Sequence, residues 1–214
     1  MNATAKMAAL LAALRTEMNG AVVEAMEERG IHYPLSYGVS LSTIRRIATP
    51  YAPDHALARL LYRQQVRELQ LAALIVADPR QITPEEAPFW LEGVQNGELA
   101  ENLARLLGET QLVPVLLQKY TGRTQSHFVR YAVLLSAARS MLFRPCQAPE
   151  ELLRILSDMR SYASFPELRA MATSLTRLAA QGAGEKEIVT TFLQSIEHSE
   201  ASYDRFLRDE IFLS

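Results

Sequence analysis

With 214 residues, of which 49% are hydrophobic and 21% charged, the chain is long enough to bury a core and too apolar to be largely disordered. A formal net charge of −2 excludes a surface coated in positive charge, and the single cysteine, Cys146, excludes an internal disulfide. These values are typical of a folded protein of the reducing cytoplasm, which is where we expect it.

Residues 1–30 predict a helix that caps the N-terminal end of the fold. Their apolar run is interrupted by Arg15 and Glu17 after eight residues, which argues against a signal peptide. No stretch of the chain approaches the roughly 20 apolar residues that cross a bilayer. We therefore expect a helix that is buried on one face, and no membrane partner.

Residues 36–48, SYGVSLSTIRRIA, place a glycine before a serine-rich helix start and two adjacent arginines. Arg45 and Arg46 are candidates for phosphate contacts, which the free amides at the helix N-terminus would support. Since successive helical residues lie about 100° apart, at most one of the two points squarely into a groove. The alternative is an ordinary solvated helix face.

Glycine and proline divide the rest of the chain into short helical segments with almost no strand signal, which predicts an all-α fold. Thr83, Pro84 and Glu86 predict a helix start with a capping box, and Asp54 predicts another N-cap. Glycines follow three periodic segments, where a left-handed C-cap is expected: Gly30, Gly108 and Gly182.

Four two-helix units can be drawn along the chain, over residues 40–78, 83–121, 125–163 and 166–197. Their lengths are typical of HEAT and armadillo repeats, although a nonrepetitive helical bundle fits the pattern as well. Residues 65–78 are apolar almost all round after Gln70, which predicts a helix buried between its neighbours. We predict one domain over 1–214, with helix pairs over 40–197 and an acidic capping helix over 199–214.

Two stretches of the sequence are similar to a known protein family: YRQQVRELQLAALIVADP, residues 62–79, and EEAPFWLEGVQNGELAENLARLL, residues 85–107. They resemble the bacterial DNA alkylation repair family, the AlkD-like HEAT-repeat DNA glycosylases, over about residues 35–180. The resemblance implies a right-handed superhelix of about a dozen helices in antiparallel pairs. It also implies a concave, basic face that holds duplex DNA.

The family excises cationic alkylated bases with a tryptophan pair followed by aspartates, and with a later tryptophan. An aromatic face and a carboxylate stabilise the positive charge of the transition state. The matching residues 96–107 contain neither tryptophan nor aspartate, and the later tryptophan position falls at Ser174. The resemblance therefore implies a diverged member without these catalytic elements. Glu98 and Glu101, at i and i+3 on one helix face, are weak catalytic candidates, and their alternative role is to complement the helix dipole.

The resemblance also bears on DNA binding. The helix HFVRYAVLL matches a family helix that carries an arginine on the concave face, which makes Arg130 its counterpart. Lys119 and Arg123 bracket a hydroxyl-rich loop that suits a phosphate backbone, with a plain polar turn as the alternative. The full predicted DNA-binding set is Arg45, Arg46, Lys119, Arg123, Arg130 and Arg177.

A further basic stripe would be formed by Arg59, Arg63 and Arg67, which recur every four residues. Gln64 and Gln65 break this stripe if they interrupt the helix. In that case Arg67 is expected to pair with Glu68 or with an acid on another helix.

The remaining residues predict no cofactor and no metal, because the four histidines lack a paired i, i+4 spacing and no histidine or aspartate lies near Cys146. Trp90, the only tryptophan, is expected to pack between repeats, with a base-facing role as the alternative. We predict a non-catalytic protein that binds duplex DNA on a concave, arginine-bearing face. The alternatives are an active glycosylase that excises N3- or N7-alkylpurines and a scaffold that holds a protein partner.

Overall fold

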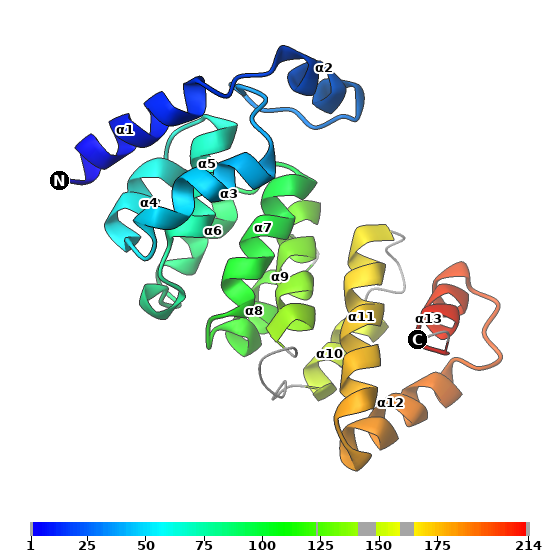
Figure 1. Cartoon of the computed structure of the whole chain (residues 1–214). Coiled ribbons are helices and arrows are strands. Elements are labelled where there is room, and N and C mark those ends of the chain that lie inside the picture. Colours follow the sequence, from blue (N-terminus) through cyan, green and yellow to red (C-terminus); the bar gives the residue numbers. More distant parts are fainter. Residues whose placement is uncertain (1, 123, 141–148, 159–164, 213–214) are drawn as a thin grey trace. The chain divides into compact units, whose positions relative to one another are not determined.

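The structure is a computed structural model that describes residues 2–122, 124–140, 149–158 and 165–212 (Figure 1). Within these ranges the regular structure consists of α-helices α1 to α13 and two short 3-10 helices, Thr49–Tyr51 and Pro79–Gln81, with no strand. The prediction of an all-α fold of about a dozen helices is confirmed. None of the described helices is both long and apolar enough to cross a bilayer.

The chain divides into two compact units, Met1–Leu106 and Leu107–Ser214, and the boundary falls inside helix α7 (Gly97–Gly108). Each unit is therefore described by itself. The single domain over 1–214, its helix pairs over 40–197 and the superhelical arrangement of the whole chain stay predictions.

The first unit is built around helix α5, which packs against α3 and α4, while α1 packs against α3 and α4 in turn. Nine of the ten α5 residues are buried, which confirms the buried helix that residues 65–78 predict. The helices of this unit before α7 are α1 (Ala3–Arg15), α2 (Gly20–Glu28), α3 (Leu41–Ala48), α4 (His55–Tyr62), α5 (Arg67–Val76) and α6 (Ala87–Glu92).

The N-terminal stretch forms two helices and not the single one that was predicted over residues 1–30. Helix α1 ends at Arg15, and Asn19 starts α2 because its side chain accepts a hydrogen bond from the Ala21 amide at 3.1 Å. An N-cap of this kind satisfies an amide that the first turn leaves free. Gly30 adopts the expected left-handed conformation after α2, whereas Gly108 and Gly182 do not.

The predicted helix start at Thr83 is wrong, because α6 begins only at Ala87. The Glu86 carboxylate does not reach back to complete a capping box. It lies 2.9 Å from Nε2 of His55 and 3.2 Å from Nε of Arg59, both on α4. The Glu86 carboxylate therefore binds two side chains of α4 and not the helix N-terminus that the local sequence pattern predicts.

The predicted N-cap at Asp54 is confirmed. Its Oδ1 accepts a hydrogen bond from the Leu57 amide at 3.0 Å, and its Oδ2 accepts one from Nζ of Lys6 on α1 at 2.6 Å. The hydrogen bond from Lys6, followed by that from the Leu57 amide, holds the pKa of Asp54 below its ordinary value. This side chain therefore starts α4 and ties it to α1.

Replacing Asp54 with alanine is expected to lower the free energy of unfolding by about 1 kcal/mol at pH 7. Because the folded pKa of Asp54 is lowered, its contribution is complete above the unfolded pKa and is lost as the pH falls through the folded pKa. Urea titrations of the variant and the wild type should therefore converge as the pH is lowered. Asp54→Asn keeps the cap and is the control; a pH-independent difference for Asp54→Ala would contradict this assignment.

The second unit follows the end of α7. Helix α9 packs against α8 and α11, and α11 also packs against α12 and α13, so α9 and α11 form its centre. The predicted C-terminal helix over 199–214 is present as α13. The helices of this unit are α8 (Val113–Tyr120), α9 (His127–Ser140), α10 (Pro149–Asp158), α11 (Phe165–Gln181), α12 (Ala183–Ser195) and α13 (Ser202–Phe212).

Candidate nucleic-acid interface

The loop that leads into α3 is fixed by a close backbone approach at Gly38. This glycine has a φ of +71°, and a β-carbon built on it would lie 1.9 Å from the Asn19 carbonyl oxygen. The Asn19 amide donates to the Tyr37 carbonyl at 2.9 Å, which holds the two segments together. Only glycine fits this position, and it thereby aligns the start of α3 and its two arginines.

A buried carboxylate from α5 holds the same loop from inside. Glu68 is fully buried and accepts hydrogen bonds from the Tyr37 amide at 3.1 Å and from the Val39 amide at 3.2 Å. The Ser36 hydroxyl donates to it as well, at 3.2 Å. Glu68 thus satisfies backbone donors that α3 itself cannot, and it sets where that helix begins.

Arg67 connects Glu68 to the start of α7. Its side chain is 4% exposed, and its Nε and Nη2 donate to the two carboxylate oxygens of Glu98 at 2.8 and 2.6 Å. Nη1 donates to Glu68 at 3.1 Å and to the Val39 carbonyl at 2.8 Å. Although burial opposes the charged form, the hydrogen bonds and negative charges of Glu98 and Glu68 raise the pKa of Arg67.

Tyr33 completes this network, because its hydroxyl donates to Glu98 at 2.7 Å. Burial, followed by the charge of Glu98, raises the pKa of Tyr33, so the hydroxyl keeps its proton and remains a donor. Neither Glu68 nor Tyr33 was among the residues that the sequence predicts to bind DNA or to catalyse. The Arg67-Glu68 pair was considered there, but no local signal shows that Glu98 is the second carboxylate.

These contacts show how Glu98, one of the two catalytic candidates, is held. Glu98 is held in a two-pronged ion pair with Arg67 and serves as a structural link between α5 and α7. Glu101 lies exposed on the same helix, one turn later. Trp90 is fully buried and packs against Tyr62, with ring centroids 4.9 Å apart, which confirms the packing role and leaves no indole face for a base.

The two arginines of α3 are both exposed but differ in their partners. Arg45 has no acidic partner among the residues described here. Arg46 lies 2.9 Å from a carboxylate oxygen of Glu17, and both side chains of this pair are open to solvent. An exposed ion pair of this kind contributes at most about 1 kcal/mol, so the Arg46 guanidinium can exchange its partner readily.

The predicted DNA-binding residues of the second unit differ in how far their side chains are buried. Lys119 is exposed on α8, whereas Arg130 is 6% exposed and lies 2.9 Å from the buried Glu167. Arg177 is half-buried and donates to the Ala138 carbonyl at 3.3 Å. Arg123 lies outside the described residues. A buried guanidinium paired with a carboxylate cannot reach a phosphate without rearrangement, so we leave Arg130 out of the interface.

Two further exposed arginines lie at the end of α4, Arg59 in the helix and Arg63 directly after it. The guanidinium carbons of Arg59 and Arg63 lie 5.4 and 5.6 Å from the centre of the Phe89 ring, which is half-buried. Helix α4 ends at Tyr62 and α5 begins at Arg67, so the stripe of three arginines is indeed broken at Gln64 and Gln65. The break leaves the first two arginines on the surface and directs the third into the core.

A cleft of about 490 Å³ opens beside Arg59. It is lined by one aromatic ring and by polar and charged side chains, two of them acidic: His55, Arg59, Gln81, Thr83, Glu85, Glu86 and Phe89. Among the residues that the structure describes, no group of three or more histidine, cysteine or acidic side chains is placed to hold a metal ion. The features of the cleft are those of a polar surface with an aromatic floor.

Comparisons with known proteins agree with this architecture. A scan against protein-family models found no match, and a search of curated proteins found no significant match either. A solved structure does match, with a TM-score of 0.70 and 16% sequence identity, over 100% of this chain and 95% of that one. It is described as "A new family of proteins related to the HEAT-like repeat DNA glycosylases with affinity for branched DNA structures". The likeness confirms the expected resemblance at the level of fold: the chain has a HEAT-like repeat fold.

Proposed function

We propose that the protein binds DNA through backbone phosphates and does not excise bases. The similar structure is that of a protein group with affinity for branched DNA, and this supports DNA as the ligand class. The observation that carries the proposal is the pair formed by Arg59 and Arg63 over Phe89. The ring, and for Arg59 also the Glu86 carboxylate 3.2 Å away, restricts these side chains before binding, so less conformational entropy is lost when they meet a phosphate.

Other exposed cations are candidates for further phosphate contacts. Arg45 and Arg46 lie at the end of α3 in the same unit, and Lys119, on α8, is a separate candidate of the second unit. Phosphate contacts from arginine and lysine fix a protein on a duplex without reading its sequence. We therefore expect binding that depends on DNA shape and salt more than on base sequence, and the predicted concave face is consistent with duplex or branched DNA.

The absence of excision follows from the residues around α7. The resemblance puts the catalytic residues at 96–107, where Glu98 is held by Arg67 and Tyr33. A carboxylate that is engaged on both oxygens is poorly placed to stabilise charge on a sugar. The side chain of Trp90, which could offer an aromatic face, is buried.

Fluorescence anisotropy with a labelled four-way DNA junction and a 25-base-pair duplex tests this proposal. We expect the logarithm of the binding constant to fall with the logarithm of the salt concentration, by about 0.9 for each phosphate contact. The double variant Arg59→Glu/Arg63→Glu should weaken binding about tenfold or more and flatten this slope, because it removes two contacts and adds repulsion.

Arg169→Glu/Arg205→Glu is the matched control, because both arginines are exposed on helices of the second unit, α11 and α13, and the double change alters the net charge by the same amount. It should leave the affinity within about twofold of the wild type. No binding to either DNA at low salt would overturn the proposal, as would equal losses in both variants. Duplexes that contain N3- or N7-methylpurines should yield no abasic product above background.

A further inference from the structure

Helix α2 stands out because none of its nine residues is buried. Its apolar side chains Val22, Val23 and Met26 are only half-covered. Met18 and Leu35, on either side of the helix, are 58% and 46% exposed and are the large hydrophobic residues that the described surface leaves open. Val23, Met26 and Leu35 line the same cleft, and apolar side chains that lie together mark an interaction site more often than scattered single residues do.

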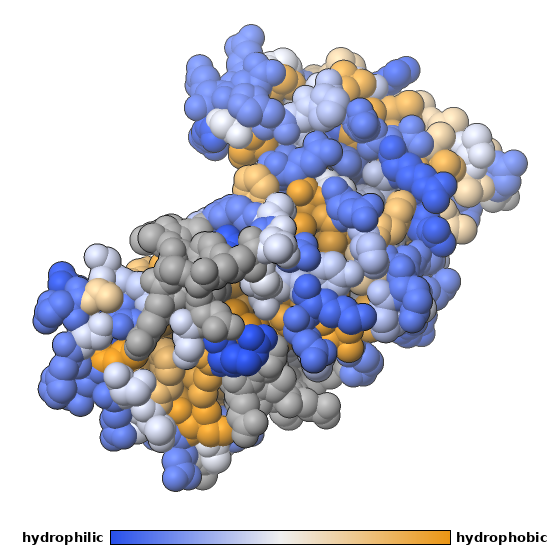
Figure 2. All heavy atoms as spheres, turned by 180° about the vertical axis from the view of Figure 1, so that it is seen from behind, coloured by the Kyte–Doolittle hydropathy of each residue, from blue (hydrophilic) through white to orange (hydrophobic). Residues whose placement is uncertain are grey.

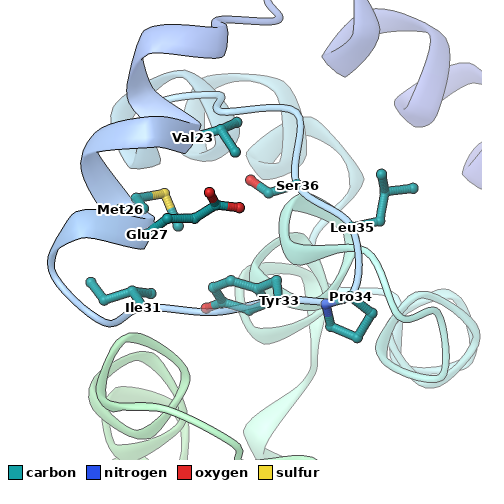
Figure 3. A pocket seen from close by; sticks show the side chains of 8 residues that line it. All are labelled: Val23, Met26, Glu27, Ile31, Tyr33, Pro34, Leu35 and Ser36. Atoms are coloured by element: carbon teal, nitrogen blue, oxygen red, sulfur yellow. The ribbon is translucent and has the colours of Figure 1, made fainter.

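A small cleft lies between α2 and the loop that follows it. It has a volume of about 220 Å³, room for one long side chain but not for a nucleic-acid strand. Figure 3 shows the Glu27 side chain extending from α2 into this space, with Met26 and Ile31 on one side and Tyr33 below it. The complete lining is Val23, Met26, Glu27, Ile31, Tyr33, Pro34, Leu35 and Ser36.

The cleft is held open by contacts on both sides. Asn19, which caps α2, is bonded through its amide to the Tyr37 carbonyl, and Gly38 lies directly against the same residue. On the other side the Tyr33 hydroxyl is fixed by Glu98. Its two walls are therefore anchored to the first unit before any ligand arrives, which lowers the entropy lost on binding.

The cleft itself is lined by one charged side chain, Glu27. Residues 15–29 contain four acids and two arginines, Arg15 and Arg29, which leaves an excess of two negative charges. Glu17 pairs with Arg46, and the other three acids lie on α2. All three are exposed, and in Figure 2 the region of α2 at the upper left shows hydrophilic residues with hydrophobic ones beside them. The three exposed glutamates disfavour a phosphate backbone on α2 itself. The acids on the helix are Glu24, Glu27 and Glu28.

We propose that the α2 cleft, defined by the eight lining residues above, is a docking site for a basic segment of a partner protein. A lysine or arginine of that segment lays its methylene groups on Val23 and Met26 and brings its charge to Glu27. Long basic side chains combine an apolar stem with a charged end, which matches this lining. Glu24 and Glu28 meet neighbouring basic residues and set the orientation.

The test uses a fluorescein-labelled 14-residue peptide in which leucine and lysine alternate with helical spacing, and a second peptide with glutamate in place of each lysine. Anisotropy at low salt should show binding of the lysine peptide only. Glu27→Lys should weaken binding about tenfold, and Glu27→Gln should weaken it less, because a neutral amide removes attraction without adding repulsion.

Asp209→Lys is the matched control, because Asp209 is an exposed acid on α13 in the second unit. It makes the same change in net charge and should leave peptide binding unaltered. Equal losses in Glu27→Lys and Asp209→Lys, no binding of the lysine peptide, or equal binding of the glutamate peptide would overturn the proposal. So would sedimentation that shows a wild-type dimer and a Glu27→Lys monomer, since a second copy would then fill the cleft.

Different variants test the docking proposal and the DNA proposal, so either can be overturned without the other. Arg59→Glu/Arg63→Glu should lose DNA binding and retain the peptide, because both arginines lie outside the cleft lining. Glu27→Gln should lose peptide affinity and retain DNA binding. Circular dichroism of each variant checks that the helices are intact.

Discussion

Replacing Glu68 with alanine is expected to lower the free energy of unfolding by about 3–5 kcal/mol, the usual cost of breaking a buried ion pair from one side. The substitution leaves the amides of Tyr37 and Val39 without their acceptor and removes one of the two carboxylates that face Arg67. Urea unfolding followed by circular dichroism measures the loss.

Two further variants make this result interpretable. Glu68→Gln keeps an oxygen acceptor but removes the charge, and it should fall between alanine and the wild type. Glu28→Ala removes an exposed glutamate from α2 and should change stability by less than about 0.5 kcal/mol. If Glu68→Ala cost no more than Glu28→Ala, the carboxylate would not hold the loop before α3.

Replacing Gly38 with alanine should also destabilise the protein strongly. An alanine at a φ of +71° costs about 1–2 kcal/mol for the backbone conformation alone. Its β-carbon would also meet the Asn19 carbonyl and the Val23 side chain, so the two segments must separate. We expect a total loss of roughly 3 kcal/mol in thermal or urea unfolding.

The chain provides a matched control for this experiment at Gly30. Its φ is +72°, almost the same as that of Gly38, but a β-carbon there would meet no atom within 4 Å. Gly30→Ala therefore measures the conformational cost by itself, and the difference between the two variants measures the contact with Asn19. Equal losses would show that this close approach is not needed.

The sequence predicts helices well where local chemistry decides them. Asp54 caps α4 as expected, and the apolar residues after Gln70 form a buried helix, because cap and periodicity are properties of a few neighbouring residues. It fails at Thr83, where Glu86 is drawn to His55 and Arg59 on another helix. A pattern within four residues contains no information about a partner some 30 positions away.

The candidate site was harder to predict for the same reason. Exposure separates the arginines, and exposure depends on which helix lies opposite: Arg130 meets Glu167 and is buried, while Arg63 lies over Phe89 and stays accessible. The spacing of Arg59, Arg63 and Arg67 suggested one stripe, but the helix break sends Arg67 inward. The resemblance identified the fold, and only the contacts show which cations stay exposed.

The Arg67 network also constrains how the first unit is made on the ribosome. Arg67 joins the Val39 carbonyl, 28 positions earlier, to Glu98, 31 positions later, and Tyr33 reaches Glu98 across 65 positions. During synthesis the loop around Val39 and the guanidinium emerge well before the carboxylate that completes them. The N-terminal helices therefore cannot reach their final, fully bonded arrangement until residue 98 has left the exit tunnel, and a chain truncated before that point carries a buried arginine with half of its acceptors missing.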